Sequence, residues 1–418
     1  MKYIDGSVIW TPTVKQLVEG HEQSVMMLWL SYEFDPSYLE IMDKEKEFFS
    51  KLTLFIGNMK HYKTTDSSTP AHVAAVKLNK FHPHVLVMIH EEFTRVWVMS
   101  TNIVKGHFGL EHQEAAWVHD FPRKKITSNI QEAKFGRDLD ELLNVVNSFA
   151  IEVKAGKPQA QLQKVIELVK SYDFNFKPGF EARLIIAVPR KSKLKHPRIR
   201  LHKLIAETRQ SNPSEENTGE RDQLLINNGF LNECDEFLEF FEEFSRICDA
   251  NMRICAATEA EVELACKFKK KPERGLSLNE GVEGSVRHLL CRILYKSLNV
   301  KAFIHSKIGL LLRSVIINGL LLLIEKACII GGANYSKAGW GMSEWDDDEP
   351  QKKMIKPTNF EVSVFLTGSR LPELLRVNQK YANETHEDNR GLGWTLSSGL
   401  AEWEDEEEVR QSKKQRIK

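Results

Sequence analysis

The sequence is poor in cysteine, with six cysteines in 418 residues and no C-x-x-C pair. Such spacing is not typical of a zinc finger or of a small disulfide scaffold, so we expect reduced, mostly buried thiols. The first ten residues lack an apolar run behind a basic end, and we do not expect them to form a secretory signal. These absences indicate a reducing compartment, either the cytosol or the nucleus.

The chain also lacks a hydrophobic segment long enough to span a membrane. Its most apolar stretch, residues 314–324, lies between Arg313 and Glu325 and is much shorter than the roughly 20 residues that a bilayer requires. The dipeptide Asn318-Gly319 interrupts the stretch, and this dipeptide is typical of a tight β-hairpin turn. We therefore predict two buried strands joined by a turn, and no membrane partner.

Neither sign of charge is in excess, because 58 lysines and arginines balance 58 aspartates and glutamates. The chain as a whole is therefore not built as a basic nucleic-acid coat, and any affinity for phosphate must come from local clusters. One cluster places seven lysines and arginines between Arg190 and Lys203. We interpret it as the wall of a groove for a nucleic-acid backbone; the alternative is a solvated basic surface.

Strand-like and helical patterns alternate along the chain, which predicts an α/β protein. We expect helices at residues 139–151 and 161–171, and strands at residues 25–30, 52–56, 85–89, 96–99, 184–188, 308–312, 320–324 and 328–330. No element is predicted between 208 and 253. The polar segment 172–179 separates two groups of elements, and the length suits two domains. We predict domains at 1–172 and 173–402, followed by a charged, disordered tail at 403–418.

One pattern of residues occurs twice. Each copy has a histidine, a basic residue two positions later, a predicted hairpin and then an asparagine: His82, His84 and Asn102 in the first copy, and His305, Lys307 and Asn334 in the second. Residues i and i+2 of a strand point to the same side, so each copy presents two groups to one pocket. Two facing copies would surround an anion with imidazoles, cations and amide donors, which suits the transition state of a phosphodiester.

This repeated pattern resembles the tyrosyl-DNA phosphodiesterase family of the phospholipase D superfamily. Residues 331–341, GGANYSKAGWG, are similar to that family's Ser-Ala-Asn-Leu-Ser-Lys-Ala-Ala-Trp-Gly. The resemblance extends from about residue 5 to 372 and is weak between 208 and 253. It implies two phospholipase D-like domains, each a mixed β-sheet flanked by helices, related by a pseudo-twofold axis and sharing an active-site cleft.

The resemblance also implies a role for each residue of the pattern. His82 would attack the phosphorus and form a covalent phosphohistidine, and His305 would protonate the leaving tyrosine and later activate water. The phosphate would be bound by His84, Asn102, Lys307 and Asn334. Glu361 would orient His82, and Gln113 would support His305, although Glu114 fits almost as well. No metal or cofactor is implied.

The implied substrate is a single-stranded or nicked DNA 3′ end that carries a topoisomerase-derived tyrosyl peptide. This implies hydrolysis of 3′-phosphotyrosyl and related adducts in DNA repair, and a nuclear location. The short basic segment at the end of the tail is either a nuclear address or a solvated terminus. Both half-sites lie in one chain, so we expect a monomer.

The first half-site departs from the family pattern, because His84 stands where the family has a lysine and Gly331-Gly332 replaces a pair with hydroxyls. Since a histidine is only partly charged near neutral pH, we expect activity to be reduced, pH-shifted or absent. Two alternative functions follow, a non-catalytic DNA-binding module and another metal-independent phosphodiesterase. A zinc site is a third alternative, with possible ligands His82, His84, His90, His107 and His112.

Overall fold

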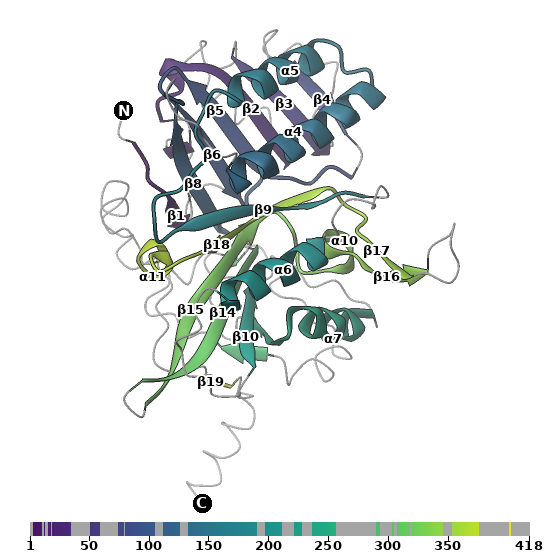
Figure 1. Ribbon diagram of the computed structural model, residues 1–418. Coiled ribbons are helices and arrows are strands. Elements are labelled where there is room, and N and C mark those ends of the chain that lie inside the picture. Colours follow the sequence, from purple (N-terminus) through teal and green to yellow (C-terminus); the bar gives the residue numbers. More distant parts are fainter. Residues whose placement is uncertain are drawn as a thin grey trace, which may run out of the picture.

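The described residues of the computed structural model form two large β-sheets, one from each half of the chain, with helices packed beside them (Figure 1), and two small sheets of two strands each. The structure describes residues 3–10, 12, 16–17, 19–34, 51–58, 74–78, 80–104, 112–125, 133–189, 197–210, 221–227, 236–255, 290–292, 303–304, 307–317, 320–345, 353–375 and 401–402.

The first sheet has seven strands in the order β1-β8-β6-β5-β2-β3-β4. Its strands are β1 (Ser7–Trp10), β2 (Ser24–Glu33), β3 (Leu52–Asn58), β4 (Ala74–Lys77), β5 (Val85–His90), β6 (Phe93–Met99) and β8 (Ala115–Pro122). A 3-10 turn, η1 (His21–Gln23), leads into β2. The pairs β2/β3 and β3/β4 are parallel, and the other neighbours are antiparallel.

The second sheet has eight strands in the order β19-β12-β11-β10-β14-β15-β18-β9. Its strands are β9 (Glu181–Ala187), β10 (Asp222–Asn227), β11 (Ala250–Cys255), β12 (Leu290–Arg292), β14 (Lys307–Ile317), β15 (Leu320–Gly331), β18 (Glu361–Thr367) and β19 (Ala401–Glu402). The pairs β10/β11 and β11/β12 are parallel, and the other neighbours are antiparallel.

The two sheets repeat one topology. From β4 to β1 in the first sheet, and from β12 to β9 in the second, two parallel pairings are followed by four antiparallel ones. Equivalent strands also occur in the same order along the chain, so β5 and β6 correspond to β14 and β15. This confirms the predicted α/β fold with two related halves. The domain limits at 172 and 402 stay predictions.

The predicted hairpin at Asn318-Gly319 is confirmed, since β14 and β15 pair in register up to Ile317 and Leu320. The division of its second strand was wrong, because the two strands expected at 320–324 and 328–330 form the single strand β15. Glu325 pairs with Leu312 beside an irregularity in the register. A charged residue within an apolar run thus marks a local irregularity and does not end the strand.

Helices α4 (Lys134–Glu152) and α5 (Lys157–Val169) pack beside the first sheet (Figure 1). α4 is amphipathic, with the buried residues Phe135, Leu139, Leu142, Val146 and Ala150 recurring at helical spacing. Gly156 separates the two helices with a φ of 59°, a left-handed conformation that glycine adopts without steric strain. Among the described residues, no helix has the length and apolar content needed to cross a membrane.

Buried residues form three hydrophobic clusters. The largest contains residues of both halves, such as Val85 and Val87 of β5 and Val362 and Val364 of β18, so the halves share a continuous core. The remaining clusters cover the other faces of the second and the first sheet. Strands buried on both faces explain the near-continuous apolar runs that the sequence shows. Cys248 and Cys328 are buried and are free thiols.

Smaller elements lie outside the two large sheets. β7 (His112–Gln113), from the first half, pairs in parallel with β13 (Phe303–Ile304), from the second. The short helix α10 (Lys337–Trp340) leads into a hairpin of β16 (Met342–Trp345) and β17 (Lys353–Lys356), and α11 (Leu371–Leu375) follows β18.

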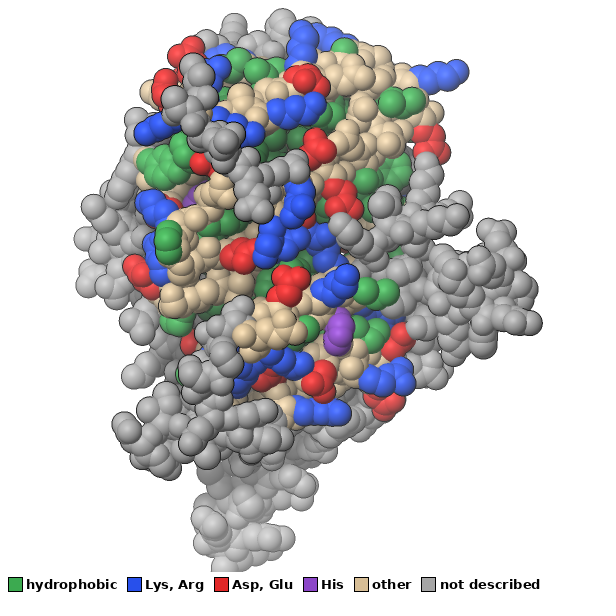
Figure 2. All heavy atoms as spheres, in the orientation of Figure 1, with side chains coloured by type: hydrophobic (Ala, Val, Ile, Leu, Met, Phe, Trp, Pro, Cys, Tyr) green, Lys and Arg blue, Asp and Glu red, His purple; other side chains and the backbone are tan. Residues whose placement is uncertain are grey.

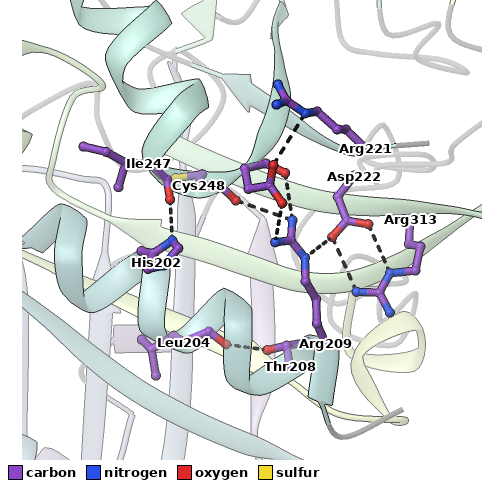
Figure 3. A network of polar contacts seen from close by, with 10 residues as sticks. His202, Leu204, Thr208, Arg209, Arg221, Asp222, Ile247, Cys248 and Arg313 are labelled. Atoms are coloured by element: carbon purple, nitrogen blue, oxygen red, sulfur yellow. Dashed lines mark hydrogen bonds and ion pairs between the residues drawn. The ribbon is translucent and has the colours of Figure 1, made fainter. Parts of the chain in front are cut away.

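Helices α6 (Pro197–Gln210) and α7 (Glu236–Cys248) cover the second sheet, and a polar network joins their ends (Figure 3). Arg209 donates to the backbone oxygens of Cys248 and Asp249, just where α7 ends, so its positive charge lies at the negative end of the helix dipole. The buried carboxylate of Asp222 receives Arg209 Nε at 2.9 Å and Arg313 Nε at 3.0 Å. Asp222 therefore connects α6 to β10 and β14.

Substitution of Asp222 with asparagine should lower the free energy of unfolding. It removes the buried carboxylate that the partly buried Arg209 and Arg313 share, a change that we expect to be worth about 2–3 kcal/mol. Asp249 provides a matched control, because it also pairs with Arg209 at 3.1 Å but is 53% exposed. Asp249→Asn should change stability by less than about 1 kcal/mol. Urea unfolding of both variants measures the change in the free energy of unfolding. Equal changes would contradict the expectation that the buried ion pairs of Asp222 stabilise the fold more than the exposed pair of Asp249.

Candidate functional site

The two halves of the chain are joined just before β5 and β18 begin. His82 donates its backbone N–H to Phe360 O at 2.8 Å, and Phe360 N–H donates to Lys80 O at 2.8 Å. These bonds form a parallel bridge between Phe81 and Phe360, whose rings stack with centroids 5.3 Å apart. Lys80 makes the turn with a φ of 57°. His82 follows Phe81 and Glu361 follows Phe360, so the bridge holds these two residues next to each other.

The side chains of His82 and Glu361 form a hydrogen bond across the two halves. His82 Nδ1 lies 2.8 Å from Glu361 Oε2, and Asn359 Nδ2 donates to Glu361 Oε1 at 3.2 Å. The glutamate is 2% exposed, whereas the histidine is 14% exposed. Because a carboxylate accepts the proton on Nδ1, the neutral form of this ring carries its lone pair on Nε2, which can act as a base or nucleophile.

Tyr32, in the last part of β2, packs against His82 with ring centroids 4.3 Å apart. The close approach depends on Gly57 of β3, where an added Cβ would lie 1.8 Å from Phe81 O and 2.8 Å from Tyr32 Cδ2. Sequence reasoning missed both residues, because no local pattern marks them. Together with Glu361, Tyr32 restricts the orientation of the histidine ring.

Lys307, the first residue of β14, is buried and reaches into the first half of the chain. Its Nζ donates to Ser100 O at 3.1 Å, just after β6. The Ser100 hydroxyl donates to the buried carboxylate of Glu114 and accepts the backbone N–H of Ala115 at 2.9 Å. An ammonium and a carboxylate from different halves are thus buried around one serine.

The buried environment of Lys307 changes the pKa of its ammonium group. Burial lowers the pKa of its ammonium from the ordinary 10.5 to about 8, while the negative charges of Glu114 and Glu361 act in the opposite direction. The group is therefore charged below about pH 8 and loses its proton above it. Since the folded protein holds this proton less tightly than the unfolded chain, the lysine's contribution to stability rises between about pH 8 and 10.5.

We expect titration of Lys307, followed by NMR of its Cε, to show a pKa well below that of an exposed lysine. Glu114→Gln should lower this pKa further, because it removes a negative charge that favours the protonated form. Lys170, which is exposed and lies in the first half, should titrate as before. A Lys307 pKa above 10, or one that does not respond to Glu114→Gln, would contradict this description of the site.

The two asparagines of the pattern differ in their contacts. Asn102 is 5% exposed, and its Oδ1 accepts the backbone N–H of Glu33 at 3.0 Å, which fixes the orientation of its amide. Asn334, which follows β15, has a buried Oδ1 that makes no hydrogen bond with the part of the chain that the structure describes. An amide fixed in this way, such as that of Asn102, presents its NH₂ group as a donor.

His84 lies fully buried beside His82, with ring centroids 5.0 Å apart and the planes nearly perpendicular. Both residues precede β5, which begins at Val85; the expectation that they lie within the strand was wrong by a few positions. The backbone bridge to Phe360 takes the place of strand pairing at this point. His84 O still accepts the N–H of Met99 at 2.9 Å, so the hairpin returns the chain beside it.

His305 lies outside the described residues, and so does the side chain of Gln113. The backbone of Gln113 is in register with Ile304, the residue before His305. Glu114 is 1% exposed, and its carboxylate lies near Lys307. Which of Gln113 and Glu114 supports His305 stays a prediction.

The predicted basic groove wall is wrong for two of its seven residues. Arg198 is buried with its Nη1 3.2 Å from Glu243 of α7, and Arg200 is buried in an ion pair with Asp138 of α4. Asp138 also receives Arg183 Nε at 2.8 Å, so these arginines connect α4, β9 and α6. Figure 2 shows Lys and Arg side chains gathered with Asp and Glu side chains between the two sheets. Arg190 and residues 191–196 lie outside the described residues.

A metal site has no support among the described residues, where no group of three or more His, Cys, Asp or Glu side chains could hold an ion. His90 and His119 are buried in separate aromatic surroundings, and burial lowers the pKa of each to about 4. His107 and the side chain of His112 lie outside the described residues.

Comparisons with known proteins give a family and a fold for this chain. The chain matches the family described as tyrosyl-DNA phosphodiesterase over residues 13–227. The crystal structure of the yeast tyrosyl-DNA phosphodiesterase is similar, with a TM-score of 0.58, 13% identity, and coverage of 87% of this chain and 90% of that chain. A mutant of the same yeast enzyme gives the same values. At this identity the likeness shows a common fold. No curated protein sequence matches significantly.

Proposed function

The chain belongs to the tyrosyl-DNA phosphodiesterase family, and from this we propose that it hydrolyses the bond between a DNA 3′ end and a tyrosine of a stalled topoisomerase peptide. The observation that carries the proposal is the hydrogen bond between His82 and Glu361, 279 positions apart, beside the buried Lys307. A histidine oriented by a carboxylate and next to a buried cation suits attack on a phosphodiester.

In the first step, His82 Nε2 attacks the phosphorus. An N–P bond forms, the P–O bond to the tyrosine breaks, and the phenolic oxygen takes a proton from His305. Glu361 supports this step, because its hydrogen bond to Nδ1 stabilises the positive charge that develops on the ring. The product is a covalent phosphohistidine and a free tyrosyl peptide.

In the second step, water attacks the phosphorus of the phosphohistidine. His305, now neutral, accepts a proton from this water, the P–N bond breaks, and DNA with a 3′-phosphate leaves. Imidazole suits both roles, since it can gain or lose a proton near neutral pH. Division of one difficult displacement into two makes each barrier lower.

Four residues bind the phosphate in this proposal. Lys307 neutralises the non-bridging oxygens, and Asn102 and Asn334 donate neutral hydrogen bonds. Asn102 is prepared for this role because its Oδ1 is already bound to Glu33 N–H. His84 contributes to the same pocket from beside His82. The alkaline limit of activity then follows the pKa of Lys307, which is about 8.

A DNA-binding module without catalysis is the second candidate. It is favoured by His84, since a partly charged imidazole stands where the family has a lysine. Another metal-independent phosphodiesterase is a third candidate, since the two half-sites would also fit other phosphodiesters.

The test is cleavage of single-stranded DNA with a 3′-phosphotyrosine in the presence of EDTA. Release of tyrosine and a 3′-phosphate supports the proposed function. Binding of the DNA without cleavage, by both the wild type and His84→Lys, would instead support the DNA-binding module. Cleavage of a nucleotide-free diester such as bis-p-nitrophenyl phosphate, but not of the phosphotyrosyl DNA, would support the third candidate.

We further propose that the protein acts as a monomer in the nucleus. The two half-sites in one chain support the monomer, and the DNA substrate, with the basic residues of segment 403–418, supports the location. Sedimentation of the purified protein and imaging of a fluorescent fusion, with and without the tail, test the two points.

A further inference from the structure

Each half-site sends its basic residue into the opposite half of the chain. Lys307, from the second copy of the pattern, contacts Ser100, which lies two positions before Asn102. His84, from the first copy, lies against Gly332, which lies two positions before Asn334. The two contacts are therefore equivalent under the internal repeat, with lysine facing serine in one and histidine facing glycine in the other.

Serine fits opposite the lysine because a lysine side chain is narrow. The ammonium of Lys307 meets the backbone oxygen of Ser100, and the serine hydroxyl turns away to Glu114 and the N–H of Ala115. A side chain at position 100 is thus accommodated next to Lys307.

No side chain fits at position 332 while His84 is present. A Cβ added to Gly332 would lie 2.3 Å from Cδ2 and 3.1 Å from Nε2 of the His84 ring, and 2.9 Å from His82 O. Gly332 cannot easily withdraw, because its N–H donates to Val362 O at 3.1 Å and it directly follows β15. The imidazole occupies the space that a side chain at 332 would need.

We infer that His84 and Gly332 form one matched pair, in which the absence of a side chain at 332 allows an imidazole to complete the first half-site. Gly332 is then a positioning residue for the reaction. It acts through His84, whose ring lies 5.0 Å from that of His82, and through the backbone of His82 itself. The catalytic part of this inference rests on the proposed function, whereas its steric part does not.

The test is a cycle of four proteins: wild type, Gly332→Ser, His84→Lys and the double variant, which has lysine facing serine as the other half-site does. Gly332→Ser alone should lower the thermal midpoint by at least about 4 °C, because it overpacks a buried position. It should lower kcat for phosphotyrosyl DNA by about 100-fold with little change in KM, because the histidines are displaced. In the double variant the thermal midpoint and kcat should both recover. Its kcat should lie within about tenfold of the kcat of His84→Lys.

Gly331→Ser is the matched control. A Cβ at Gly331 would lie 2.4 Å from Ser363 Oγ and 2.5 Å from Val362 O, and no atom of His84 is among its three nearest. His84→Lys should therefore rescue Gly332→Ser and leave Gly331→Ser unrescued. A Gly332→Ser variant that is as stable and active as wild type would overturn the inference, and so would equal losses from Gly332→Ser in the presence and absence of His84→Lys. If the wild type cleaves no phosphotyrosyl DNA, the proposed function fails, and the thermal midpoints of the four proteins still decide the steric pairing.

Discussion

Replacement of His82 by alanine is expected to abolish release of tyrosine from 3′-phosphotyrosyl DNA. If His82 Nε2 forms the bond to phosphorus, its removal leaves only binding and electrostatic contributions, so kcat should fall by about 10⁴-fold or more. The fold should persist, because the bridge between Phe81 and Phe360 is made by backbone atoms and by the two phenyl rings. Single-turnover cleavage measures the rate, and intact mass after acid-free quenching detects the DNA adduct on the wild type.

Glu361→Gln serves as the graded comparison for this result. Glutamine can still hold His82 Nδ1 but carries no negative charge, so the loss should be clear and smaller than for His82→Ala. His90→Ala is a control for a buried histidine elsewhere in the same sheet, and it should act through stability alone. Cleavage by His82→Ala within tenfold of the wild type would disprove the nucleophilic role.

Lys307→Met is expected to lower kcat by about 10²–10³-fold while the protein stays folded. Loss of one preorganised donor to a developing anion typically has an effect of this size. Methionine has a similar length and no charge, so it fills the buried space and removes an ammonium whose burial is unfavourable. The unfolding midpoint should therefore not fall, and a kinetic loss without loss of stability is characteristic of a residue that stabilises the transition state.

Lys326 provides the control for Lys307→Met. It is also buried, at 8% exposed, but it lies within β15 of the same hairpin, five residues before the Gly331 end of that strand. Lys326→Met should leave kcat nearly unchanged. A Lys307→Met enzyme with more than a tenth of the wild-type kcat would show that Lys307 has a structural role only.

The elements that sequence predicted well are those with a strong local pattern. The hairpin at Asn318-Gly319, the strand β5 and the amphipathic helix α4 have turn residues or apolar spacings that depend on near neighbours in the chain. The elements between 208 and 253, including α7 and β10, were not predicted. Helix α7 nevertheless has apolar residues at helical spacing, and Phe240, Phe244 and Leu224 join one cluster on the second sheet.

The same division holds for the candidate site. The repeated pattern of a histidine, a basic residue and an asparagine is a property of the sequence, as is the departure at His84, because both are read from residue types at fixed spacing. The bridge of Phe81 to Phe360, the orientation of His82 by Glu361 and the packing of Tyr32 were decided by the tertiary structure.

The burial of these groups, which determines their charge and reactivity, was also decided only by the tertiary structure. Arg198 and Arg200 read as surface charges in the sequence and are buried in ion pairs, and Lys307 has a pKa of about 8 because water is excluded around it. The match of His84 to Gly332 depends on a contact between opposite halves of the chain. The sequence by itself determined which chemical groups this protein carries and where its hairpins turn, since these depend on local spacing. The distances between the side chains of the site, their protonation and the space around them depend on how distant segments of the chain pack.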